Sequence, residues 1–178
     1  MKISEIKKNN IFPFEIKDRI LRLIFSFFLH KAPKLDSHLA LKIDINEEEV
    51  WNNYIKDWDK ETYRFYSSEL EKKKPLDGCN LIDDSMIKRK DRGFICIKNK
   101  GENEYRFLTR HLRNSIAHGH VYMKKQSNRI FLLFEDYAEQ RMKKPPKKTA
   151  IILVSKNDLI KLKHEIKKEK NKNNKMNI

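Results

Sequence analysis

The sequence of 178 residues is poor in residues that interrupt or cross-link a chain, with four glycines, five prolines and two cysteines. Few glycines and prolines favour helices over a loop-rich or all-β fold. Two cysteines cannot build a disulfide framework, and Cys79 and Cys96 lack metal-ligand spacing. The most apolar run, Leu23 to Leu29, is too short to span a bilayer, and the N-terminus lacks the features of a signal peptide. A cytoplasmic protein is therefore expected.

Acidic residues are scarce relative to basic ones, 25 against 40, which gives a net charge of +15. The shortage is greatest from Tyr105 to Phe134, where no Asp or Glu occurs. The same stretch contains Arg106, Arg110, Arg113, Lys124, Lys125 and Arg129. This balance predicts an anionic partner, either nucleic acid or an anionic membrane. A general preference for Lys, Asn and Ile explains the lysines but not the clustered arginines.

Hydrophobic periodicity predicts a mainly α protein, a helical bundle with a small antiparallel β-hairpin or sheet inserted near the C-terminus. We expect a single domain over residues 1–170, with the β insertion at 120–155. The expected helices cover residues 13–30, 46–73, 102–118 and 156–170. The polar end, residues 171–178, is expected to be a disordered basic tail.

Local signals support several of these bounds. Asn46 and Glu49 have the spacing of a capping box, and Gly119 is placed as a left-handed glycine that ends a helix. Residues 74–100 show no clear periodicity. Within them lies a basic cluster, IKRKDR at 87–92, which is either a solvated face or a binding site.

The most informative residues lie in the last turns of the helix expected at 102–118. Residues four apart share a helix face, which aligns Arg110, Asn114 and His118 and brings His111 close to that line. Arg113 lies about 140° around the helix from His118. Those two side chains would therefore meet only at a frayed helix end or across a symmetric dimer. Imidazole suits acid–base chemistry near neutral pH, and a guanidinium suits phosphate oxygens.

The segment Arg113-Asn-Ser-Ile-Ala-His118 resembles the Arg-x(4–6)-His motif of the HEPN superfamily, in which a polar residue such as Asn114 commonly follows the arginine. The longer phrase RHLRNSIAHG, followed by IFLLFED and KTAIILVS, is similar to a HEPN subfamily with a β-hairpin after the motif. The resemblance implies a helical homodimer whose motif helices meet at the interface. It also implies a metal-independent endoribonuclease of toxin–antitoxin, abortive-infection or CRISPR-associated systems, which cleaves by attack of the ribose 2′-OH on the adjacent phosphate.

By this resemblance His118 is the acid–base group, Arg113 stabilises the phosphate and Asn114 positions the reacting groups. One departure is His120, which stands where a toxin subgroup has a tyrosine that a nucleotidyltransferase modifies. Expected RNA contacts are Arg110, His111, Lys143, Lys144, Lys147 and Lys148. No cofactor or metal is expected, because no Cys or acid lies near His111, His118 and His120 to complete a zinc site. The expected partners are RNA, a second copy of the chain, and an antitoxin or other regulatory protein, with no membrane.

Other interpretations of the same residues stay open. The polar groups at 113–118 could simply cap a helix end and bind a loop. The basic loop 141–148 could hold an RNA backbone by counterion release or be a solvated loop. At the level of function, the alternative is a non-catalytic HEPN-like module that binds RNA or a protein partner.

Overall fold

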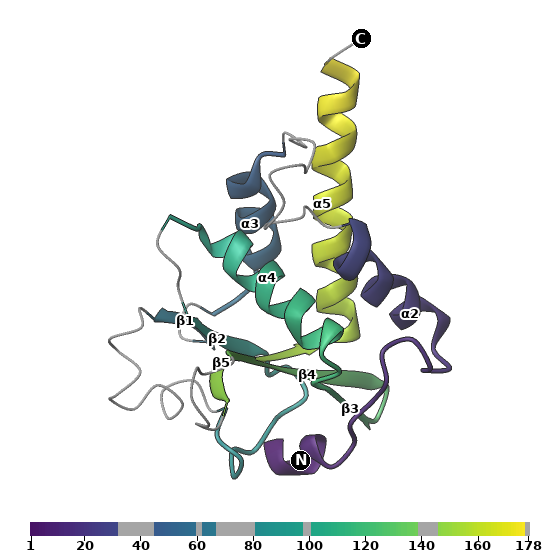
Figure 1. Ribbon diagram of the computed structural model, residues 1–178, viewed down its shortest axis with the longest axis vertical. Helices are drawn as coiled ribbons and strands as arrows, with labels where there is room; N and C mark the ends of the chain where they lie inside the picture. Colours follow the sequence, from purple (N-terminus) through teal and green to yellow (C-terminus); the bar gives the residue numbers. More distant parts are fainter. Residues whose placement is uncertain (32–44, 60–61, 67–80, 98–100, 139–145, 177–178) are drawn as a thin grey trace.

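The computed structural model describes residues 1–31, 45–59, 62–66, 81–97, 101–138 and 146–176. Its centre is a five-stranded β-sheet with most of the helices on one face (Figure 1). The prediction of a mainly α helical bundle with a small β insertion is therefore wrong. Short apolar runs cannot be assigned to helix or strand by periodicity alone, and here the sheet is the layer against which the helices pack.

The sheet has the strand order β1-β2-β5-β4-β3. Its strands are β1 Tyr63–Tyr66, β2 Gly93–Ile97, β3 Val121–Gln126, β4 Arg129–Ala138 and β5 Lys147–Ser155. Neighbouring strands are antiparallel except for β1, which pairs in parallel with β2. The last three strands lie within 120–155, where strands were expected, but the first two come from segments without a strand prediction.

Side chains alternate between the two faces of the sheet, as the two-residue period of a strand requires. Phe94, Phe134 and Ile152 belong to the larger core, under the helices. The intervening residues Ile95 and Leu133 belong to a second, smaller core on the opposite face. The sheet is thus buried on both sides, which explains why β4 and β5 read as nearly continuous apolar runs.

The helix-covered face carries α2 Arg19–Ser26, its π-helical continuation η1 Phe27–Lys31, α3 Glu47–Ile55, α4 Glu104–Ala117 and α5 Lys156–Met176 (Figure 1). The short α1, Ile3–Lys7, packs on the other face with the smaller core. Three helices begin at a capping side chain: Asp18 accepts from Leu21, Asn46 from Glu49 and Asn103 from Arg106. These side chains satisfy backbone donors that no helical carbonyl can reach.

Three expected helix bounds are corrected. The helix expected at 13–30 begins at Arg19, where Asp18 caps it. The helix expected at 46–73 ends at Ile55, and Tyr63–Tyr66 instead forms β1. The stacking of Tyr63 on Phe94 of the neighbouring strand, with 5.4 Å between ring centroids, shows the tertiary contact that overrides helical periodicity there. The expected tail at 171–178 is helical as far as Met176. Among the helices that the structure describes, none combines the length and apolar character needed to cross a membrane.

Candidate active site

The junction of α4 and β3 determines how His118 is presented. His118 is the C-cap of α4, and its backbone N–H donates to the Asn114 carbonyl at 2.9 Å. Gly119 follows with φ of 72°, a left-handed conformation that favours glycine. The chain then reverses, and the N–H of His120 donates to the Ser115 carbonyl at 2.9 Å. This tight turn leaves His118 exposed at the end of the sheet.

A cleft of about 540 Å³ opens beside this turn. Its described lining consists of His118, His120, Tyr122, Tyr137 and Pro146. The rings of His118 and His120 stack with centroids 6.3 Å apart, and Tyr137 meets His120 edge-on at 5.0 Å. Two imidazoles and two phenols therefore share one opening, which we call the histidine cleft.

Beneath this end of the sheet, His111 forms a buried ion pair with Asp136. The His111 side chain is 1% exposed, and its Nδ1 lies 2.6 Å from Asp136 Oδ2. The other ring nitrogen, Nε2, lies 3.1 Å from the Ile97 carbonyl oxygen. Both neighbours are hydrogen-bond acceptors, so the buried ring is held between a carboxylate and a backbone carbonyl. Asn114 Nδ2 donates to the same Asp136 oxygen at 3.2 Å, so three polar groups join α4 to the sheet.

The electrostatics of Asp136 follow from these contacts. Burial raises the pKa of its carboxyl, but the hydrogen bond and charge of His111, with the hydrogen bond from Asn114, outweigh burial. The pKa of Asp136 therefore lies below its usual value, which favours the ionised carboxylate.

Glu135 points to the opposite face of the sheet and is also buried and paired. Its Oε1 accepts from Lys148 at 2.5 Å and lies 3.1 Å from Lys7 Nζ, while Oε2 accepts from the Tyr137 hydroxyl at 2.7 Å. Burial raises the pKa of Glu135, but these partners hold it below its usual value. Burial and the bond to Glu135 raise the pKa of Tyr137, so its phenol stays protonated. Tyr137 consequently offers the cleft a neutral ring.

The residues expected to act at the site separate in the structure. His118 lines the histidine cleft, whereas Arg113 and Asn114 are half-buried on α4 and are not among its described lining residues. Arg113 and His118 are therefore not both among the described lining residues of this cleft, and their expected joint action stays a prediction. His120 and Tyr137 do meet His118 there. The only sequence signal for His120 is its position two residues after His118, at the entrance to a strand.

The expected RNA contacts also separate. His111 is buried, so in this structure its side chain has no surface on which RNA could bind. Arg110 Nε and Nη2 each donate to Glu102 at 3.0 Å, so its guanidinium is committed within the chain. Lys148 is paired with Glu135, while Lys147 is exposed at the start of β5. Lys143 and Lys144 lie outside the described residues. Across the part of the chain that the structure describes, no cluster of three His, Cys, Asp or Glu is arranged to hold a metal ion.

Comparison with protein families gives one match. A family model described as HEPN pEK499 p136 matches residues 3–175. The chain therefore belongs to this HEPN family. Comparisons with curated proteins and with solved structures found no match.

Proposed function

We propose that this protein is a metal-independent endoribonuclease that cleaves RNA by attack of a ribose 2′-OH on the adjacent phosphate. HEPN membership supports ribonuclease chemistry as a class. The observation that carries the proposal is the histidine cleft, where the exposed His118 lies beside a second imidazole and a neutral tyrosine. The chain's net charge of +15 suits a polyanionic substrate.

The reaction needs a base that takes the 2′-OH proton and an acid that protonates the departing 5′-oxygen. We assign the base or acid role to His118. The stacked ring of His120 is placed to serve as its counterpart, because 6.3 Å between centroids leaves both rings within the same opening. Tyr137 supplies a flat face against which a base or sugar can pack. The products are a 2′,3′-cyclic phosphate and a 5′-OH end.

Arg113 is assigned a role through a second copy of the chain, and Asn114 a role within its own chain. Arg113 is not part of the described lining of the cleft on its own chain. We propose a homodimer in which Arg113 of one copy approaches the His118 cleft of the other and stabilises charge on the phosphate. Asn114 holds Asp136 and so positions the end of α4 that carries His118.

A cleavage assay in EDTA tests the activity. Wild-type protein is expected to cut single-stranded RNA, while His118→Ala and Arg113→Ala lose cleavage and keep their circular dichroism spectra. Equal cleavage by all three proteins would remove these residues from the mechanism. Absence of cleavage by well-folded wild-type protein, with RNA binding retained, would support the alternative of a non-catalytic binding module. Cleavage that disappears only in EDTA would indicate a metal nuclease.

Mixing the two inactive variants tests the composite site. If Arg113 acts across the dimer, a heterodimer of His118→Ala and Arg113→Ala contains one site with both residues intact. Cleavage should then return on mixing, after subunit exchange. Persistent inactivity of a heterodimer isolated with two affinity tags would show that both residues act within one chain.

We further propose that the cell uses the enzyme as a toxin or antiphage effector, held in check by an antitoxin or other regulatory protein. Induced expression of wild-type protein should then arrest growth, whereas expression of His118→Ala at the same level should not. Growth arrest by both proteins would separate toxicity from RNA cleavage.

A further inference from the structure

A second hollow lies at the other end of the sheet from the histidine cleft. It has a volume of about 580 Å³ and is bordered by the loop before β2, the β3–β4 turn and the start of α5. Its charged lining consists of Arg89, Arg92, Arg129, Lys156 and Asp158, and we call it the arginine recess. Arg129 begins β4 and Tyr137 stands near its other end. They are eight positions apart along the strand, which corresponds to roughly 26 Å.

Among the residues that line the recess, four basic side chains share one carboxylate, Asp158. Asp158 Oδ1 accepts from Arg92 at 3.0 Å, and Asp158 Oδ2 accepts from Arg129 at 3.4 Å. Arg129 Nε is buried and has no hydrogen-bond partner among the described residues. Burial, with repulsion from Arg92 and Arg89, lowers the pKa of Arg129 despite the opposing effects of Asp158 and Asp91. An anion in the recess would relieve this imbalance.

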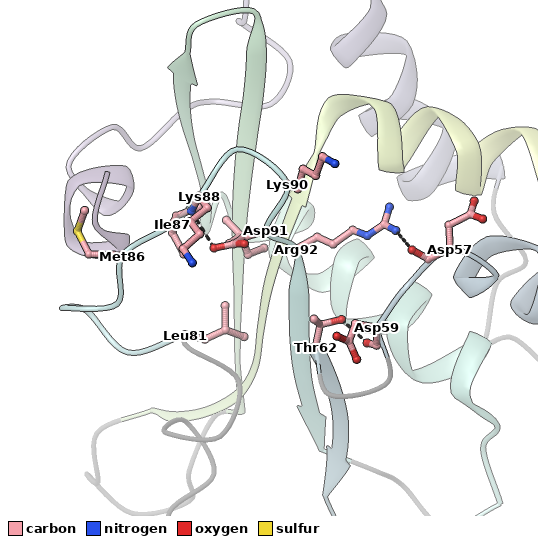
Figure 2. A pocket seen from close by; sticks show the side chains of 11 residues that line it. Asp57, Asp59, Thr62, Leu81, Met86, Ile87, Lys88, Lys90, Asp91 and Arg92 are labelled. Carbon is pink, nitrogen blue, oxygen red and sulfur yellow. Dashed lines mark hydrogen bonds between the residues drawn. The ribbon is translucent and has the colours of Figure 1, made fainter.

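The basic groups around the recess are held in place by their surroundings. Arg92 lies 4.7 Å above the Trp58 ring and also donates to the Asp57 carbonyl, as the dashed line in Figure 2 shows. The loop before it is fixed by a turn in which the Lys88 N–H donates to Asp91 Oδ2 at 2.8 Å. Figure 2 shows this contact in an adjoining hollow, which shares Arg92 with the recess.

The attraction for an anion comes from side chains, since the N-terminus of α5 is already capped. Ser155 N–H donates to Asp158 Oδ2 at 2.8 Å, and Asp158 N–H donates to Ser155 Oγ at 3.2 Å. Lys156 is paired with Asp18 at 2.5 Å. Arg89 is exposed at the turn, so its guanidinium and those of Arg92 and Arg129 are the groups that a ligand would meet.

We propose that the arginine recess binds a phosphate group of the same single-stranded RNA whose scissile bond lies in the histidine cleft. Guanidinium groups bind phosphate oxygens through paired, charge-assisted hydrogen bonds. With bases stacked at about 3.4 Å per nucleotide, the two sites lie roughly eight nucleotides apart. A long RNA can therefore occupy both sites at once, whereas a dinucleotide bound in the histidine cleft does not reach the recess. The choice of RNA as the source of the phosphate rests on the proposed function.

Binding of uncleavable RNA tests the proposal without requiring activity. The probes are a 2′-O-methyl RNA of about twelve nucleotides and a 2′-O-methyl dinucleotide, titrated at several salt concentrations. Arg89→Ala is expected to weaken binding of the long RNA about five-fold and to reduce the slope of log affinity against log salt by about 0.7, the value for one phosphate contact on a single strand. Binding of the dinucleotide should not change. Lys170→Ala, which removes one exposed charge from the outer part of α5, should leave the slope unchanged.

Three outcomes are decisive once circular dichroism shows that the variants are folded. Identical long-RNA slopes for Arg89→Ala and wild type would overturn the RNA contact. If Lys170→Ala weakened long-RNA binding as much as Arg89→Ala, the effect would come from the overall charge of the protein, and the proposed site would be wrong. A loss of binding to free AMP in Arg89→Ala, with long RNA unaffected, would keep the phosphate site but assign it to a free nucleotide. Failure of wild-type protein to cleave RNA would count against the proposed enzyme and leave these binding results valid.

Discussion

The two ends of the sheet differ in how acidic and basic side chains are paired. At the histidine cleft, the buried Asp136 pairs with His111 and the buried Glu135 with Lys148, while the imidazole of His118 is exposed. At the arginine recess, one carboxylate of Asp158 is shared by two guanidiniums. The first arrangement builds a rigid support under a group that can move protons. The second leaves an excess of positive charge, which suits holding a phosphate.

The largest effect is expected on RNA cleavage, from a substitution at the histidine cleft. His118→Ala should lower kcat/KM for RNA by about 10³-fold, within the range typical of general acid–base catalysis. Because His118 is exposed, the melting temperature should stay within a degree or two of wild type. His164→Ala is the matched control, since it removes an exposed histidine on α5. Comparable losses in both variants would mean that His118 has no special role.

Substituting Asp136 and Asp158 in turn should lower the unfolding free energy by different amounts at the two ends of the sheet. Asp136→Ala removes the buried partner of the His111 ring and is expected to cost about 3–5 kcal/mol of unfolding free energy. Asp158→Ala frees two arginines that can reach water and removes a helix cap, and should cost only about 1–2 kcal/mol. Urea unfolding followed by circular dichroism measures both. Equal losses of unfolding free energy would contradict the difference between the buried Asp136 cluster and the more exposed Asp158 cluster.

Arg110 allows a comparison between an arginine paired within the chain and Arg89, which is exposed at the recess. Its guanidinium is tied to Glu102, and both side chains are mostly buried. Arg110→Ala should therefore cost about 1–2 kcal/mol in urea unfolding. The same variant should leave the salt dependence of long-RNA binding unchanged, in contrast to Arg89→Ala. If Arg110→Ala reduced the slope of log affinity against log salt, Arg110 would contact RNA, as expected from the sequence.

The smallest expected effect is in acid. The pKa of Asp136 is lower in the folded state than its ordinary value of 3.8, so the unfolded chain binds more protons between the two values. The stability that Asp136 contributes is complete above the ordinary value and is lost as pH falls through the folded value. Unfolding free energies measured from pH 6 to about pH 3 should fall less steeply in Asp136→Asn than in wild type. Parallel curves would show that the ion pair does not control acid stability.

Part of this structure could be predicted from local sequence signals. The stop at Gly119 and the cap at Asn46 depend on neighbouring residues alone, and both occur where their patterns indicate. The strands at 129–138 and 147–155 are apolar enough to recognise. These features require no knowledge of distant parts of the chain.

The parts that could not be predicted depend on long-range contacts. β1 follows a stretch with helical spacing, and only its pairing with β2 makes it a strand. His111 was expected to contact RNA, and no acid lies from Tyr105 to Phe134. The two residues directly after that stretch, Glu135 and Asp136, supply the carboxylates, and Asp136 reaches His111 across 25 positions. A local absence of acid therefore said nothing about the partner that folding provides.

The most direct test of the central claim is identification of the RNA ends produced in EDTA. RNA cut by wild-type protein should carry 2′,3′-cyclic phosphate and 5′-OH termini, detected by mass spectrometry of the fragments. His118→Ala should yield no such fragments, while His164→Ala yields them at the wild-type rate. Fragments with 5′-phosphate termini, or equal yields from His118→Ala, would contradict proton transfer by His118 at the histidine cleft.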